Sequence, residues 1–442
     1  MYSLRHSVQS GQSAIAPSAT SLLAPADGVC CIDIALSVDA SSLAVALSNR
    51  VVKTYDSLTL RPTHTFTLPQ HGNDVLRGVQ WSDSESNIIF AASGSDDWGP
   101  GNAHTPRSAN IFCFDTRTGR AETTLRLDAL ANANDAGELG AFAVSASGSL
   151  IAVGLGPSIA FCDLRAVSNG SGFDNSSNST GSSALVPRTL GVFSESHSEA
   201  ISCLSFHPTL REHVLSGGDD GLVCIFDTRI TGENDAIVSV LSAGSSVARV
   251  GVFGTHGAFA HVLTRTGGIS LWNIGSAEQI ASFPSLLDDS RSASLPGGID
   301  FLVACHYDIR RDSLSLLAGS HEGALHSFDV TPSTVSLTGT LPRGHLCGVR
   351  AAAWTAVGSD TGGLIFTAGE DGRVCQWADT GALERLGTSR PQQGTGVGVS
   401  KREAGVLKRE LAYANNHTQS SGGRRNEEAE HFGLTAAAAV ID

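Results

Sequence analysis

The sequence has little of what several classes of protein need. It holds 29 Lys and Arg residues against 43 Asp and Glu, a formal net charge of −14, so it lacks the basic surface with which proteins bind nucleic acid. No stretch approaches the roughly 18 apolar residues of a membrane helix, and the N-terminal region has no apolar run of signal-peptide length. We therefore expect no membrane association, no direct nucleic-acid binding, and an intracellular protein of the cytoplasm or nucleus.

Signatures of catalytic, cofactor and metal sites are also lacking. None of the nine cysteines forms a Cys-x-x-Cys pair, and no His spacing suits zinc. The glycine-rich pieces lie in expected β-turns without the following helix that phosphate binding requires, and scattered carboxylates form no defined catalytic pair. We expect no enzyme activity, no cofactor and no metal. Four cysteines lie among apolar neighbours in expected strands and resemble small buried hydrophobic residues in a reducing compartment: Cys113, Cys162, Cys224 and Cys375.

What the sequence does contain is a repeat. Seven times a short apolar run ends in an aromatic residue, or a stand-in for one, followed closely by a small acid or amide. The seven ends are Tyr55-Asp56, Phe114-Asp115, Cys162-Asp163, Phe226-Asp227, Trp272-Asn273, Phe328-Asp329 and Trp377-Ala378-Asp379. They recur at intervals of about 46 to 64 residues, the period of a β-propeller blade with a variable loop. Because one blade cannot bury its apolar faces alone, the repetition predicts closure into a ring.

The predicted fold is all-β, a seven-bladed β-propeller over residues 28–388. Residues 1–27 are expected to form a loose N-terminal arm that includes a candidate closing strand for the last blade. Residues 389–442 are expected to be a polar, mostly disordered tail, with a short helix over 401–413. The Ser/Asn/Gly-rich loop 168–183 is also predicted to be disordered, since such a composition cannot repay the entropy of ordering.

Several phrases resemble the WD-repeat family. They are Gly344-His345, Ala368-Gly369-Glu370-Asp371-Gly372 with Trp377, Ser194-Glu195-Ser196-His197, Phe206-His207-Pro208, Leu215-Ser216-Gly217 and Asp220-Gly221-Leu222-Val223. The similarity is strong in blades four, six and seven and thinner in blades one to three. Only Trp272 and Trp377 place tryptophan in the aromatic slot, and Cys162 has no ring. Members of this family mostly serve as interaction platforms, so the resemblance implies a non-enzymatic scaffold for protein partners.

Two sets of residues have the types found in a nucleophilic triad. They are His197, Ser216 and Asp220, and His345, Thr367 and Asp371. A nucleophile needs an exposed, strained turn and an oxyanion hole, whereas Ser216 and Thr367 lie inside expected strands. The WD-repeat resemblance implies instead a structural hydrogen-bond chain from turn Asp to His to Ser or Thr, ending at Trp377 in blade seven.

The turns between second and third strands open on one face of a propeller, and here they carry acids. The candidates for a solvent-facing negative rim are Asp96, Asp219, Glu322 and Glu370. Such a rim would steer a basic peptide towards the central opening. The alternative is that turns favour acids because these bond their own backbone. Trp98, in a Gly/Pro-rich loop with Arg107, is a candidate contact anchor, unless its ring folds under the loop.

A third pattern is Asp followed two residues later by Arg. The arginines are Arg117, Arg165 and Arg229. The pattern resembles the box by which some WD-repeat proteins dock onto the adaptor of cullin-four ubiquitin ligases. The alternative is a solvated strand-end pair between each Arg and its own Asp. Two further functions thus stand beside the scaffold: a ligase substrate receptor, and an enzyme using the central channel, for which no repeating titratable groups appear. In either binding role we expect a monomeric propeller within a larger complex.

Overall fold

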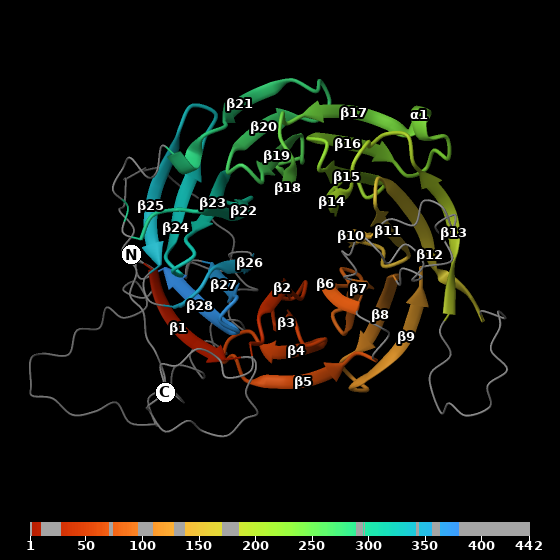
Figure 1. Cartoon of the computed structure of the whole chain (residues 1–442), viewed down its shortest axis with the longest axis horizontal. Coiled ribbons are helices and arrows are strands. Elements are labelled where there is room, and N and C mark those ends of the chain that lie inside the picture. Colours follow the sequence, from red (N-terminus) through yellow and green to blue (C-terminus); the bar gives the residue numbers. More distant parts are fainter. Residues whose placement is uncertain are drawn as a thin grey trace, which may run out of the picture.

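Short apolar runs separated by tight turns fold into four-stranded antiparallel blades. The computed structural model describes residues 2–9, 28–69, 74–95, 109–127, 138–169, 185–288, 295, 297–341, 344–355 and 363–379. In these ranges seven blades surround one axis, and each blade begins at the axis and adds strands outward (Figure 1). The seven-bladed propeller predicted from the repeat is confirmed.

The first four blades lie in the order of the chain. Blade 1 comprises β2 (Cys31–Leu36), β3 (Ser42–Leu47), β4 (Val51–Asp56) and β5 (Pro62–Thr67). Blade 2 comprises β6 (Asp74–Trp81), β7 (Ile88–Ser95), β8 (Ala109–Asp115) and β9 (Arg120–Arg126). Blade 3 comprises β10 (Leu139–Val144), β11 (Leu150–Leu155), β12 (Ser158–Asn169) and β13 (Leu185–Phe193). Blade 4 comprises β14 (Ile201–Phe206), β15 (His213–Gly218), β16 (Leu222–Asp227) and β17 (Ile237–Ser242), with the single turn α1 (Glu233–Ala236) before β17.

The last three blades complete the circle. Blade 5 comprises β18 (Val247–Phe253), β19 (Phe259–Thr264), β20 (Ile269–Asn273) and β21 (Gln279–Phe283). Blade 6 comprises β22 (Phe301–Asp308), β23 (Ser313–Gly319), β24 (Leu325–Val330) and β25 (Val335–Leu341). Blade 7 comprises β26 (Val349–Trp354), β27 (Leu364–Gly369), β28 (Arg373–Asp379) and β1 (Tyr2–Gln9).

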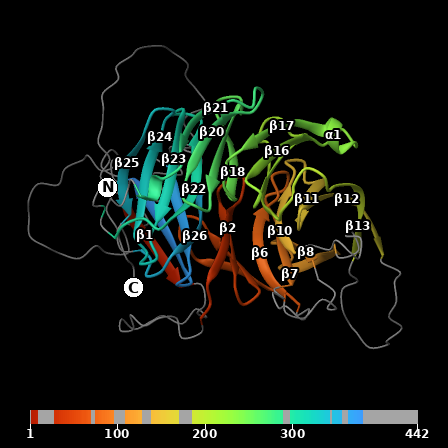
Figure 2. The same ribbon diagram turned by 45° about the horizontal axis from the view of Figure 1, so that its top comes forward.

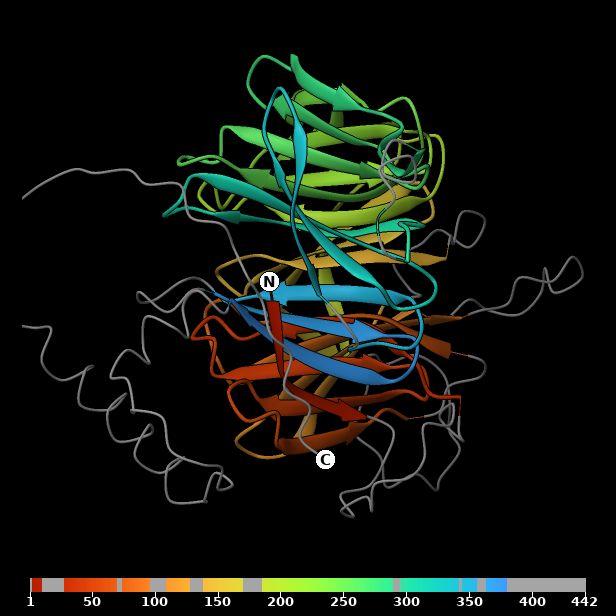
Figure 3. The same ribbon diagram turned by 90° about the vertical axis from the view of Figure 1, so that its left-hand side faces the viewer.

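Blade 7 closes the ring because its strands come from both ends of the chain. Strand β1 pairs antiparallel with β28, from Tyr2 opposite Asp379 to Gln9 opposite Arg373, and lies beside it in Figure 3. The N-terminal arm therefore supplies the outer strand of the last blade. Each buried cluster of the described core joins two neighbouring blades, and one of them packs blade 7 against blade 1. Burial is thus shared around the whole circle, as closure requires.

The innermost strands share one irregularity. Each has a register shift near its start, for example between Leu76 and Gly78 in β6 and between Ile201 and Cys203 in β14. Figure 2 shows these strands lining the axis. We call the face with the turns between second and third strands the upper face. The opposite, lower face carries the turns between first and second strands and between third and fourth strands.

Some segments differ from the predicted boundaries, and others lie outside the described residues. Ser168 and Asn169 are not loop residues, because β12 extends to Asn169. The outer strands of blades 2 and 3 also meet, through a parallel pair of Leu185 with Leu125. Residues 170–184, the expected helix 401–413 and the tail 389–442 lie outside the described residues. Cys162 takes the aromatic slot in register, opposite Ile151 as Phe226 is opposite Val214.

Candidate functional site

In blade 7 a continuous chain of hydrogen bonds joins four residues that the sequence singled out. His345 Nδ1–H donates to Asp371 Oδ1 at 3.2 Å, and His345 Nε2 accepts from the Thr367 hydroxyl at 2.7 Å. The indole N–H of Trp377 donates to the same hydroxyl oxygen at 2.8 Å. All four side chains are buried. The polar groups of this chain are therefore paired with one another in a site closed to water, which fixes the loop before β26 to the turn before β28.

The carboxylate of Asp371 is the anchor of this chain. Burial alone would raise its pKa, but the hydrogen bond from His345 and the backbone N–H groups of Leu346 and Arg373 outweigh burial and lower the pKa. A lowered pKa means that Asp371 contributes stability above the ordinary value of 3.8. That contribution is lost as the pH falls through the folded-state pKa, below 3.8.

Blade 4 repeats the chain without its last member. His197 Nδ1–H donates to Asp220 Oδ2 at 3.1 Å, and His197 Nε2 accepts from the Ser216 hydroxyl at 2.7 Å. Asp220 also accepts the backbone N–H of Leu222 at 3.0 Å. Phe226 fills the slot of Trp377 and has no N–H to donate, so here the chain ends at Ser216.

The burial of these side chains argues against the interpretation as nucleophilic triads. The side chains have the order Asp, His and hydroxyl, but Ser216 and Thr367 are both 0% exposed. A substrate carbonyl could not reach either hydroxyl in the folded protein, whereas a nucleophile must be accessible. The arrangement can brace the blades, and it cannot attack a substrate without local unfolding.

Replacing Asp220 with Ala should lower the free energy of unfolding by about 1 to 3 kcal/mol. The change leaves the buried imidazole of His197 and the backbone N–H groups of Ser198 and Leu222 without their acceptor. Urea unfolding at neutral pH measures the difference. Asp235→Ala, an exposed acid of the same blade, is the matched control and should change stability by less than about 0.5 kcal/mol. A hydrolase activity lost in Ser216→Ala at an unchanged melting temperature would contradict the bracing role.

On the upper face, two of the predicted rim acids are paired with arginine. Asp219 Oδ1 lies 3.2 Å from Nε of Arg265 in the neighbouring blade, and Glu370 Oε1 lies 2.7 Å from Nε of Arg350. Glu322 is exposed in the turn before β24 and has no hydrogen bond or ion pair among the described residues. The upper face therefore presents ion pairs as well as free negative charge.

Three further candidates were predicted for the upper face. Asp96, Trp98 and Arg107 lie outside the described residues, between β7 and β8. The contact anchor at Trp98 thus stays a prediction.

The three Asp-x-Arg boxes adopt one geometry on the lower face of blades 2 to 4. The pairs are Arg117 with Asp115, Arg165 with Asp163 and Arg229 with Asp227, at 2.5, 3.0 and 2.6 Å. The arginine side chains are 62, 75 and 67% exposed. The hydrogen bond from Arg229 lowers the pKa of Asp227 to about 2. Each guanidinium thus pairs with its own Asp while most of the arginine side chain is exposed.

Residues facing the axis were not identified from the sequence. Asp33 Oδ2 in β2 accepts the backbone N–H of Val79 in β6 at 3.0 Å, so it ties blade 1 to blade 2. The Gln80 amide donates to the carbonyl of Val144 at 3.2 Å and accepts its N–H at 3.0 Å, which ties blade 2 to blade 3. The one signal available was a polar residue inside an otherwise apolar first strand, as in Cys31-Ile32-Asp33-Ile34.

The described ranges hold no group of three or more His, Cys, Asp or Glu side chains arranged to bind a metal ion. In the same part of the chain, no helix has both the length and the apolar character to cross a bilayer.

Comparison with known proteins finds WD-repeat similarity in two segments of the chain. The WD40 model, described as "WD domain, G-beta repeat", matches residues 188–227 and 335–378, which contain the two polar chains of blades 4 and 7. WD repeat-containing protein 89 homolog of Dictyostelium discoideum is 23% identical over 357 residues, 80% of this chain and 85% of that protein. WD repeat-containing protein GTS1 of Arabidopsis thaliana is 29% identical over 208 residues, 45% of this chain and 52% of that protein.

Proposed function

We propose that this chain, which carries two matches to the WD-repeat model and closes into a seven-bladed propeller, is a non-enzymatic scaffold for protein partners. WD-repeat propellers in general bind proteins and do not catalyse reactions. The observation that carries the proposal for this chain is the burial of its two His-centred chains, which assigns the residues most suited to chemistry to internal bracing. The proposal includes an intracellular location, in cytoplasm or nucleus, and a monomeric propeller that joins a larger complex.

The upper face is the proposed contact surface for a basic peptide. The net charge of −14 favours a basic partner, and Asp219, Glu322 and Glu370 lie in turns that open on this one face. Arg265 and Arg350 compensate two of these three acids, so Glu322 is the one among them whose charge has no ion-pair partner in the described structure. A partner could also displace the exposed arginines from their acids, since surface ion pairs are weak.

Affinity purification of the full chain followed by mass spectrometry tests both the scaffold role and the basic-peptide surface. The triple variant Asp219→Asn, Glu322→Gln and Glu370→Gln should lose partners with basic segments. The control neutralises three exposed acids of the lower face: Glu85→Gln, Glu212→Gln and Glu278→Gln. An unchanged partner set in the upper-face variant would remove the basic-peptide site. The absence of any reproducible partner of the unmodified chain would remove the scaffold itself.

The second candidate function is a substrate receptor of a cullin-four ubiquitin ligase. The observation that favours it is the recurrence of one exposed Asp–Arg geometry on three successive blades. Purified chain should bind the ligase adaptor, and a variant with Arg117, Arg165 and Arg229 replaced by Ala should not. Failure of the unmodified chain to bind, or equal binding by the variant, would eliminate this candidate.

A further inference from the structure

The lower face differs from the upper face in its exposed apolar residues. Five large apolar side chains are exposed in its turns: Val38, Leu58, Leu210, Ile230 and Ile309. In the described turns and connections of the upper face only Leu346 is exposed in this way. Apolar side chains spread over one face and interleaved with exposed charges are typical of a surface that contacts another protein.

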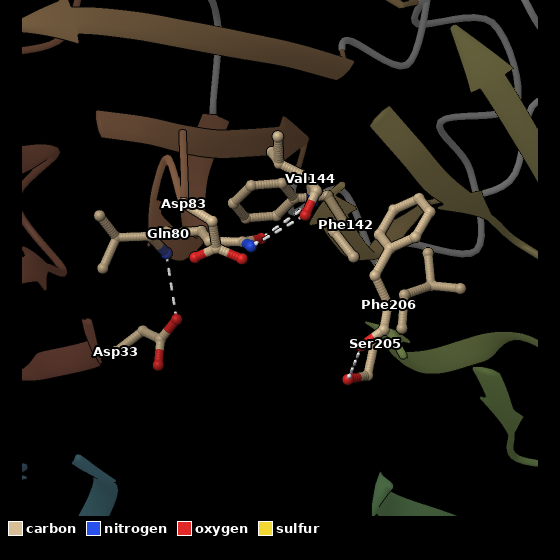
Figure 4. A pocket seen from close by; sticks show the side chains of 10 residues that line it. Asp33, Gln80, Asp83, Phe142, Val144, Ser205 and Phe206 are labelled. Carbon is tan, nitrogen blue, oxygen red and sulfur yellow. Dashed lines mark hydrogen bonds between the residues drawn. The ribbon is translucent and has the colours of Figure 1, made fainter. Parts of the chain in front are cut away.

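A cavity opens among the ends of the inner strands that lead to this face. It has a volume of about 290 Å³ and is lined by residues of the first strands of blades 1 to 4 and the turn after β6. Figure 4 shows Asp33, Asp83 and Ser205, from three different blades, bordering one space, with the rings of Phe142 and Phe206 on one side of it. Val38 and Leu210, which are 61 and 48% exposed, lie in the turns that follow two of these strands.

The polar side chains that line the cavity differ in how many hydrogen bonds they make. The Gln80 amide is fully engaged with Val144, and Ser205 Oγ lies 3.4 Å from the carbonyl oxygen of Phe206. Asp83 has no hydrogen bond among the described residues, and Asp33 accepts the Val79 N–H through one of its two carboxylate oxygens. What remains open to a ligand is therefore negative and lies beside two phenyl rings.

The surroundings of both carboxyls disfavour an unpartnered negative charge. Burial raises the pKa of Asp33, and the charge of Arg249 only partly offsets this effect. Asp83 is exposed, yet the protein that partly surrounds its carboxyl raises its pKa as well, against the charge of Arg211. No ion pair within hydrogen-bonding distance joins either carboxyl to these arginines in the described structure. A cation in the cavity would supply the missing partner.

We propose that this cavity binds the cationic side chain of a lysine or arginine from a protein that docks on the lower face. At about 290 Å³ the cavity is at the small end of pockets for free ligands, about 300 to 1,000 Å³, and suits one inserted side chain. The carboxylates recognise its charge, the rings of Phe142 and Phe206 contact its aliphatic stem, and the exposed Val38 and Leu210 contact apolar neighbours on the partner. The site lies on the face opposite the proposed basic-peptide surface and is independent of it.

Other ligand classes fit this cavity less well. An anion would face two carboxylates and no positively charged donor in hydrogen-bonding contact with the space. A metal ion would need at least three ligands, and the described residues include no such group here. An apolar side chain would leave both carboxyls unpaired in a partly desolvated space.

Ligand-observed NMR with the full chain tests the site. The probes are nine-residue peptides that differ only at one central position, which is Lys, Arg, norleucine or Glu between two Leu in a Gly/Ser background. We expect saturable binding of the Lys or Arg peptide at millimolar Kd or tighter, and none of the Glu peptide. Asp83→Asn, and Asp33→Asn with Asp83→Asn, should weaken binding by about tenfold or more, because each removes a charged partner of the cation.

Glu85→Gln is the matched control, since it removes the same charge two residues after Asp83 from a side chain that does not line the cavity. It should leave the affinity unchanged. Melting temperatures verify that each variant is folded. If the double variant does not fold, the single variant Asp83→Asn still tests the proposal. Equal binding of the norleucine peptide, equal binding by the Asp variants, or no binding of either cationic peptide would overturn the proposal. Each of these results leaves the upper-face partner set untouched, so the two proposals fail separately.

Discussion

A chain in which residues 2–9 are replaced by a Gly/Ser segment of equal length should lose about 3 kcal/mol or more of its free energy of unfolding. Among the described strands, β1 is the one outer strand of a blade that comes from the opposite end of the chain, and it pairs with β28 from Tyr2–Asp379 to Gln9–Arg373. Its loss removes this ladder and exposes the edge of β28, which carries the fully buried Val374, Cys375 and Trp377. Urea unfolding and the melting temperature of both proteins measure the effect.

A synthetic peptide with residues 1–10 provides the control for this prediction. It can pair with the exposed edge of β28 and should raise the melting temperature of the altered chain as its concentration rises. A scrambled peptide of the same composition should not. If the altered chain unfolds at the same urea concentration as the unmodified chain, then β1 does not close the ring.

Part of the strand pattern of blades 4 and 7 could be predicted from the sequence. The apolar runs 201–206 and 349–354 coincide with β14 and β26, and the runs 222–226 and 364–368 differ from β16 and β27 by one residue. The runs 214–216 and 374–377 are each three residues shorter than β15 and β28. These runs are bounded by Gly, Asp and Pro, which define the turns through backbone preferences. The His-centred chains were also foreseeable, because residue type and spacing place Asp, His and hydroxyl in one blade.

Contacts between blades could not be predicted, since they depend on how far each blade is rotated about the axis. Asp219 was expected to face solvent freely, but Arg265 of the next blade reaches it across 46 positions of sequence. Asp33 meets Val79 in the same way. Such partners are set by the packing of neighbouring sheets and leave no local pattern in the sequence. The cavity at the lower face belongs to this class, because its two carboxyls come from different blades.

Trp377→Ala should be the most destabilising single substitution in blade 7, with a loss of about 3 to 5 kcal/mol. The side chain is 0% exposed and belongs, with Cys375 and Val349, to the buried cluster between blades 6 and 7. It also closes the polar chain through Thr367. A Cβ on Gly344 would collide with its ring, so glycine is needed there to let the indole lie against the loop. Deleting the ring therefore leaves a cavity, removes the contact that holds the loop at Gly344, and removes the donor to Thr367.

Trp377→Phe separates these contributions. It keeps most of the ring volume and loses the N–H, which converts blade 7 to the arrangement already present at Phe226 in blade 4. We expect this variant to lose about 1 to 2 kcal/mol, well below the loss in Trp377→Ala, because Thr367 retains its hydrogen bond to His345. Urea unfolding of both variants measures the difference. The same two substitutions at Trp272, the matched tryptophan of blade 5, provide the comparison. Equal stability of the Phe and Ala variants would show that the indole N–H contributes more than packing. A negligible effect of Trp377→Ala would contradict the role assigned to this side chain in holding blades 6 and 7 together.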